Sequence, residues 1–170
     1  MTFNQRVNTT LPAEVVYETL RDSYDKLAIY SHNIKKIETL EREKTENGVK
    51  TVSKWYAEYL NKKIAWLDIR ECFDNKHTCV FTLEPFVFKE YIDIHGENAC
   101  LSKGRHSTVT MTGDINMYVR NEAAISPVLK NKVDYTITKI AYPLIKPNFS
   151  KIIKGIQQYI KKNNPPTKSI

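Results

Sequence analysis

Hydrophobic and polar residues alternate over most of the first 120 positions, which is the pattern of half-buried β-strands. Residues 2–10 form the first such run, and Leu11-Pro12 ends it. An amphipathic stretch follows from Pro12 to about Asp22, and a second short helical or turn segment ends near His32-Asn33. We therefore expect one strand followed by two short helices at the start of the chain.

Residues 35–119 form successive alternating runs separated by turn residues. Asn47-Gly48 between two such runs is a strong hairpin signal. Further turns are expected at Asn61-Lys62 and at residues 74–76, and Gly96 indicates a bulge or turn. The pattern predicts about six strands here, seven with the first, in a mostly antiparallel sheet.

The last long pattern covers roughly residues 133–162, with apolar residues every three or four positions, as on one face of a helix. Pro143 and Pro147 interrupt it, and each should kink or break a helix. Both a kinked helix and two helices joined at residues 142–147 fit this pattern. We expect a loop or a short element over residues 120–132, a single domain over 1–163 and a disordered tail over 164–170.

The order of these elements limits the architecture. One face of a mostly antiparallel sheet of this size must be covered by another element, and only the terminal helix is long enough to cover it. A curved sheet that holds one long helix tends to leave a cavity between the two. The elements therefore predict an α+β fold and make a ligand pocket the first functional hypothesis.

Composition agrees with an ordinary globular domain, with 41% hydrophobic and 26% charged residues among 170. The first residues lack the apolar core of a signal peptide, and three cysteines fit free thiols in a reducing compartment, so we expect a cytoplasmic protein. The net charge of +7 comes largely from lysines near the C-terminal end, typical of a solvated helix face. Charge is the only feature of the sequence that favours binding to nucleic acid, so we expect no nucleic-acid partner. A transient contact with a membrane surface stays open.

Three segments resemble the START-like (SRPBCC) superfamily, which holds birch-pollen-allergen-like proteins, START lipid-transfer domains, polyketide aromatase/cyclases and coenzyme-Q-binding proteins. Residues 7–17, VNTTLPAEVVY, are similar to its first strand and its Pro-x-x-x-Val-aromatic helix start. Residues 110–115, TMTGDI, resemble its last strand, and residues 145–159 resemble its long helix. The resemblance implies a helix-grip fold, in which a curved antiparallel sheet of six or seven strands wraps around the C-terminal helix.

The function that the resemblance implies is binding or transport of a hydrophobic small molecule or lipid between the sheet and the helix. Ligand pockets are lined mainly by apolar and aromatic side chains. We predict the following wall residues, some of which will be ordinary core: Trp55, Tyr59, Leu67, Ile69, Phe81, Met111, Ile145 and Phe149. Glu71 either points inward with them or lies at the sheet margin, and the pattern does not say which sheet face is concave.

Two other functions remain open: an aromatase/cyclase-like enzyme acting on a bound polyketide-like substrate, and a protein-interaction module like a co-chaperone or regulator. No nucleophile motif, acid–base pair or glycine-rich phosphate loop is recognisable, so the catalytic residues are unknown and no cofactor is expected. Cys72, His77 and Cys79 form one loose cluster, which is too little for a typical zinc site, and we expect no metal.

Overall fold

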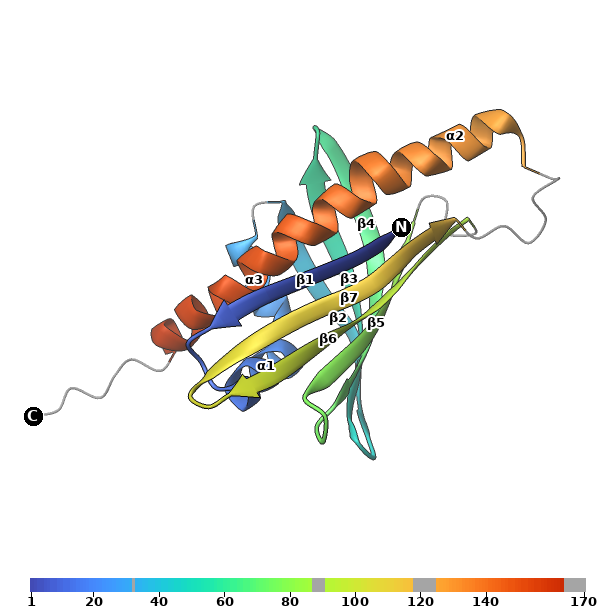
Figure 1. Ribbon diagram of the computed structural model, residues 1–170. Helices are drawn as coiled ribbons and strands as arrows, with labels where there is room; N and C mark the ends of the chain where they lie inside the picture. The colour runs from blue at the N-terminus through green and yellow to red at the C-terminus, as the bar shows by residue number, and fades with distance from the viewer. Residues whose placement is uncertain (32, 87–90, 118–124, 164–170) are drawn as a thin grey trace, which may run out of the picture.

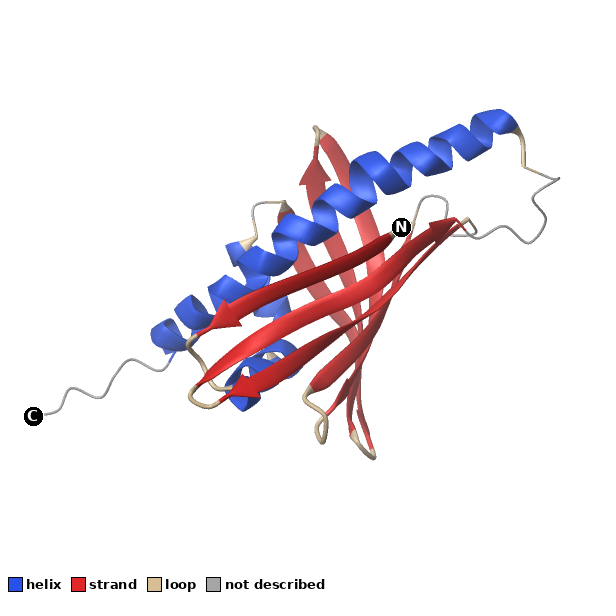
Figure 2. Ribbon diagram, viewed as in Figure 1, coloured by secondary structure: helices blue, strands red, loops and turns tan. Residues whose placement is uncertain are grey.

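The computed structural model describes residues 1–31, 33–86, 91–117 and 125–163. Seven strands form one antiparallel sheet in the order β1-β7-β6-β5-β4-β3-β2, and the sheet curves around a long C-terminal helix (Figures 1 and 2). The strands are β1 (Thr2–Thr9), β2 (Ile34–Thr45), β3 (Gly48–Tyr59), β4 (Lys62–Phe73), β5 (Thr78–Pro85), β6 (Ile92–Lys103) and β7 (His106–Met117). The predicted helix-grip fold is confirmed.

The turns set the register of the sheet. Thr45 pairs with Gly48 across the first hairpin, and Tyr59 pairs with Lys62 across the second, so the turns are Glu46-Asn47 and Leu60-Asn61, each one residue earlier than the sequence indicates. After the last hairpin, β1 pairs antiparallel with β7, so the first and last strands are neighbours. The hairpins therefore join all seven strands into one continuous sheet whose edges are β1 and β2.

Two short helices follow β1, as predicted: α1 (Ala13–Asp22) and the 3-10 helix η1 (Tyr24–Tyr30). Val16, Tyr17 and Leu20 form the buried stripe of α1. The Tyr17 hydroxyl donates to the Asp74 carboxylate at 2.8 Å, and the Tyr17 ring stacks on His77 at 5.2 Å. Helix α1 is thereby attached to the turn between β4 and β5.

The C-terminal helix consists of α2 (Pro127–Thr136), a π-helical turn η3 (Ile137–Ala141) and α3 (Tyr142–Asn163). Ser126 caps it by accepting a hydrogen bond from the Leu129 amide, so the helix begins earlier than the expected residue 133. It continues through Pro143 and Pro147, and the alternative of two helices joined there is wrong. The π-turn lies directly before Pro143, where the backbone hydrogen-bond pattern is disturbed.

The apolar face of α3 forms the centre of the core, where Ile152, Ile153 and Ile156 are almost fully buried. Figure 1 shows that α2 projects past the end of the sheet. Within the described residues, no helix combines the length and the apolar character that crossing a membrane would need. The predicted tail at 164–170, the end of the last strand beyond Met117, and Phe88 lie outside the described residues.

Candidate ligand cavity

A cavity of about 110 Å³ lies between the concave face of the sheet and the C-terminal helix. Its deep end is buried, at Asp68, Arg70 and Asn98. Its rim is formed by half-buried residues, including Ile64, Pro85, Thr136, Ile140 and Ala141. The walls between are apolar and come from the central strands and from α3: Ile34, Trp55, Trp66, Phe81, Leu83, Ile92, Ile94, Met111, Leu144, Ile145, Phe149 and Ile152.

Five of the predicted wall residues line this cavity, namely Trp55, Phe81, Met111, Ile145 and Phe149. Trp55 stacks on Trp66 with ring centroids 5.5 Å apart, and Tyr24 packs against Trp55 at 5.2 Å. Aromatic side chains from β3, β4 and η1 therefore meet in one wall. Whether these residues bind a ligand stays a prediction.

Three predicted wall residues do not line the cavity. Tyr59 is the last residue of β3 and packs against the core beyond the rim. Leu67 and Ile69 lie on the outer face of β4, because Tyr59 pairs with Lys62 and Trp55 therefore pairs with Trp66. Side chains of paired residues share a face and alternate along each strand, so Trp55 shares its face with the even-numbered residues of β4.

The same register places Asp68 and Arg70 inside, on the face opposite to Leu67 and Ile69. Glu71 lies on the outer face, where it pairs with Lys50. Sequence reasoning missed Asp68, Arg70, Asn98, Tyr24 and Trp66 as cavity residues. The available signal was the turn at Asn61-Lys62, since it fixes which residues of β4 share a face with Trp55.

Asp68 and Arg70 form a buried ion pair at 2.8 Å, with only 3% and 8% of their side chains exposed. The Arg70 guanidinium also lies over the Tyr24 ring at 4.0 Å and over the Phe81 ring at 5.6 Å. Burial acts to lower the pKa of Arg70, but its interactions with Asp68 and Tyr24 together outweigh burial and the pKa is raised. Arg70 therefore keeps its charge inside the cavity wall. Burial raises the pKa of Tyr24, which keeps its hydroxyl neutral.

Several buried polar atoms around the cavity have no hydrogen-bond partner among the described residues. They are Asp68 Oδ1, Arg70 Nη1, Asn98 Oδ1 and Trp55 Nε1. Asn148 differs, since its amide donates to the Leu144 carbonyl at 2.8 Å and accepts from Ser31. A buried polar atom without a partner destabilises a fold by about 1–3 kcal/mol. The unpartnered donors and acceptors thus concentrate around the deep end of the cavity and suit a polar group on a ligand.

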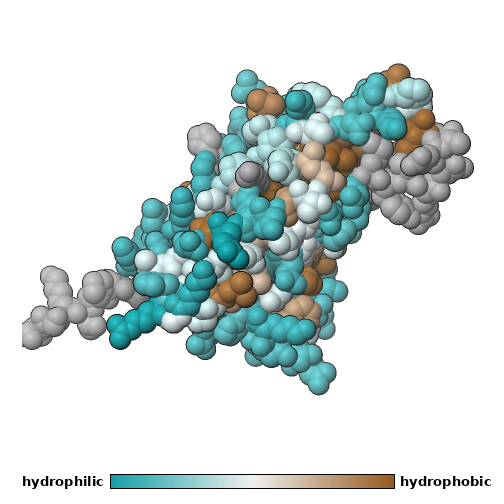
Figure 3. Space-filling model, in the orientation of Figure 1, coloured by the Kyte–Doolittle hydropathy of each residue, from teal (hydrophilic) through white to brown (hydrophobic). Residues whose placement is uncertain are grey.

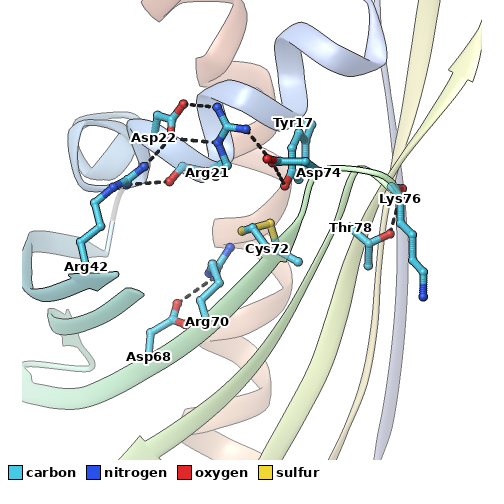
Figure 4. The surroundings of a disulfide bond; sticks show 11 residues. Tyr17, Arg21, Asp22, Arg42, Asp68, Arg70, Cys72, Asp74, Lys76 and Thr78 are labelled. Atoms are coloured by element: carbon cyan, nitrogen blue, oxygen red, sulfur yellow. Dashed lines mark hydrogen bonds and ion pairs between the residues drawn. A yellow bond between two sulfur atoms is a disulfide. The ribbon is translucent and has the colours of Figure 1, made fainter. Parts of the chain in front are cut away.

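The expectation of three free thiols is wrong for two of them, because Cys72 and Cys79 form a disulfide between directly paired positions of β4 and β5. Figure 4 shows it beside Arg70 and close to the Tyr17–Asp74 contact. Cys100 is free and buried, and burial raises the pKa of its thiol to about 12. The disulfide removes one argument for a reducing compartment, and the cytoplasmic location stays a prediction. Among the described residues, no cluster of His, Cys, Asp and Glu is suited to a metal ion.

Comparison with known proteins finds similarity in structure and not in sequence. No family model and no curated protein matches the chain. TTHA0849 from Thermus thermophilus has a TM-score of 0.71 at 21% identity, over 96% of this chain and 99% of its own. The Zhui aromatase/cyclase from Streptomyces sp. R1128 has a TM-score of 0.73 at 11% identity, over 96% and 98%. A START superfamily protein from Mycobacterium smegmatis has a TM-score of 0.59 at 10% identity, over 93% and 98%.

The chain has the helix-grip fold that these solved structures share. At these identities the similarity carries the fold alone, and function has to be argued from the cavity.

Proposed function

We propose that this helix-grip protein binds a hydrophobic small molecule or lipid that carries one neutral polar group. The observation that supports this most is the apolar cavity whose deep end holds a buried, incompletely hydrogen-bonded Asp68–Arg70 pair. The apolar body of the ligand would lie between Trp55, Trp66 and the η3–α3 face of the helix. Burial of apolar surface contributes about 25 cal/mol per Å² to such binding.

The charge balance at the deep end favours a hydroxyl or carbonyl group over a carboxylate. Arg70 already has a compensating charge in Asp68, so the pair is neutral as a whole. Arg70 Nη1 can donate to an oxygen, and Asp68 Oδ1 can accept from a hydroxyl. A second, uncompensated charge would have to be buried in a cavity that is otherwise apolar, which is unfavourable.

Size limits the ligand. The cavity of about 110 Å³ is below the roughly 300–1,000 Å³ of typical ligand pockets. It suits a small aromatic or branched body as it stands, and a longer lipid would require the helix to move away from the sheet. The rim residues Thr136 and Ile140 lie on α2 and η3, at the end of the helix that projects past the sheet (Figure 1). This end is where we expect entry.

A matched pair of probes tests the proposal. We expect 1-naphthol to bind about tenfold or more tightly than naphthalene, because its hydroxyl can form a hydrogen bond with a charged side chain, which strengthens binding by about that factor. The Asp68→Leu/Arg70→Met double variant should bind both equally, and Ala141→Trp, which fills the rim, should weaken both. Lys154→Trp, on the exposed side of α3, is the control. Equal binding of the two probes by the unmodified protein would refute the polar group, and no binding of either would refute the cavity.

An aromatase/cyclase-like enzyme is the second candidate, and the same pair supports it. Arg70 Nη1 could donate to a ketone oxygen while Asp68 Oδ1 accepts a proton from the carbon between two ketones. The resulting enolate would attack a second carbonyl of the same chain, the alkoxide formed would take the proton back from Asp68, and the alcohol would then lose water. Mass spectrometry of a poly-β-ketone incubated with the protein would detect that loss. Product from the unmodified protein but not from the Asp68→Leu/Arg70→Met double variant would favour the enzyme over a binding protein.

A further inference from the structure

Large apolar side chains stand exposed around the rim of the cavity. They are Leu60 in the β3–β4 turn and Val128 and Tyr135 on α2, with 61%, 65% and 50% of their surface exposed. Monomeric proteins commonly expose single apolar residues, but a group gathered at one place marks an interaction site. Figure 3 shows brown, hydrophobic surface over the α2 end of the molecule.

Contacts between these segments place them at the same end. The Lys62 ammonium lies over the Tyr135 ring at 5.9 Å, which joins the β3–β4 turn to α2. Val128 and Tyr135 are seven residues apart and therefore share one face of α2. The exposed apolar residues thus surround the opening at which we expect ligand entry.

Leu60 has an unusual backbone for its residue type. Its φ is 50°, and that of Asn61 is 59°, so both central residues of the turn are left-handed. Such turns favour Asn, Asp or Gly, and a leucine there is strained. The turn therefore presents a bulky apolar side chain to solvent at a position where a polar residue would be more stable. A partner that buries Leu60 would explain it.

The charge at this end is mostly positive. Exposed lysines stand beside the apolar residues: Lys62 and Lys63 at the start of β4, and Lys130, Lys132 and Lys139 on the helix. They outnumber the exposed acidic residues of the same described segments, which are Glu58, Glu84 and Asp134. On α2 and η3, Val128, Lys132, Tyr135 and Lys139 alternate along one face. Apolar side chains among lysines are suited to the interface of an anionic bilayer, where the former enter the lipid and the latter meet phosphate.

We propose that the rim of the cavity docks on an anionic lipid bilayer through Leu60, Val128, Tyr135 and the neighbouring lysines. The cavity then opens against the bilayer, and a ligand passes between the two without crossing water. The proposal rests on surface residues and goes beyond ligand binding, which depends on the deep end. The membrane contact here is made by the end of the helix and a β-turn, whereas the apolar face of α3 is buried in the core.

Flotation with phosphatidylcholine vesicles, with and without phosphatidylglycerol, tests the docking. We expect binding only to the anionic vesicles, decreasing with salt. Leu60→Asn/Val128→Asn should weaken it about tenfold or more, because it removes two apolar insertions without changing charge or straining the turn. Lys62→Gln/Lys63→Gln should weaken it by about fivefold per lysine. Ile29→Asn/Leu101→Asn is the matched control, with exposed apolar residues on η1 and near the β6–β7 turn, away from the rim (Figure 1).

Equal vesicle binding by the rim and control variants would overturn the proposal, as would no binding to anionic vesicles or equal binding to both vesicle types. A concentration-dependent dimer that the rim variant abolishes, without vesicle binding, would identify a second copy of the chain as the partner and also overturn it. Naphthol binding in solution separates this proposal from the function of the cavity. The rim variant should keep that binding, so either proposal can fail while the other holds.

Discussion

Arg70 and Asp68 lie two residues apart on β4, and their side chains pair at 2.8 Å within the wall of the cavity. Strand alternation places both on the concave face, where water is largely excluded. Such a pair contributes less to stability than its attraction suggests, since both charges had to be removed from water. Its effect on folding can be separated from its effect on binding.

Removing one member of the pair should destabilise the protein strongly. We expect Asp68→Ala to lower the free energy of unfolding by about 3–5 kcal/mol, because Arg70 is left as a buried, uncompensated charge. Urea denaturation monitored by tryptophan fluorescence measures it. The Asp68→Leu/Arg70→Met double variant should lie within about 1–2 kcal/mol of the unmodified protein, since it replaces both charges with apolar groups. A double variant as unstable as Asp68→Ala would show that packing, not charge, causes the loss.

The deep end of the cavity shows where sequence reasoning stops. Alternation and turn residues predict the strands, and the first two turns lie one residue before the predicted Asn47-Gly48 and Asn61-Lys62. The prediction of Trp55, Leu67 and Ile69 as wall residues of one cavity is wrong for the latter two, because the second hairpin puts Leu67 opposite Lys54. On β4 both faces carry apolar residues, so alternation alone does not identify the concave face. The pairing with β3, read from the turn, was the information required.

Other differences have equally local causes. The helix begins at Pro127 because Ser126 caps it, yet α2 has only one fully buried residue, Val133, and therefore a weak apolar stripe. The Cys72–Cys79 disulfide depends on direct pairing of two positions across β4 and β5. A count of cysteines could not predict that pairing.

The stability of the protein should fall at alkaline pH. Burial raises the pKa of Cys100 to about 12 in the fold, while an exposed thiol has a pKa of about 8.5. Above pH ~9 the unfolded chain loses the proton and the folded chain keeps it, so stability falls between about pH 9 and 12, by up to about 1.4 kcal/mol per pH unit. Urea denaturation at increasing pH measures it. Cys100→Ala should give a flatter profile in this window, and an unchanged profile would contradict the role of the thiol.

Reduction of the disulfide should lower stability moderately. The bridge joins residues only seven positions apart, so it closes a short loop and contributes about 2–3 kcal/mol. Thermal unfolding with and without a reductant should show a lower midpoint under reducing conditions. The Cys72→Ala/Cys79→Ala variant should unfold at the same temperature in both, whereas Cys100→Ala should keep the full response. A reductant effect that persists in the double variant would mean that the bridge is not its source.

Gly155 on α3 lies where the long helix meets η1, and a methyl group there would collide with Tyr30. A Cβ on Gly155 would stand 2.4 Å from the Cβ and Cγ of Tyr30. Alanine favours a helix over glycine by about 1 kcal/mol, but forced overpacking of a core contact costs about 1–3 kcal/mol. We expect Gly155→Ala to destabilise the protein in urea denaturation, and to stabilise it when Tyr30 is already glycine, because an alanine at position 30 would keep the colliding Cβ. The sign of the change in the free energy of unfolding thus reports how tightly η1 packs against α3. Stabilisation in both backgrounds would show that this contact is loose.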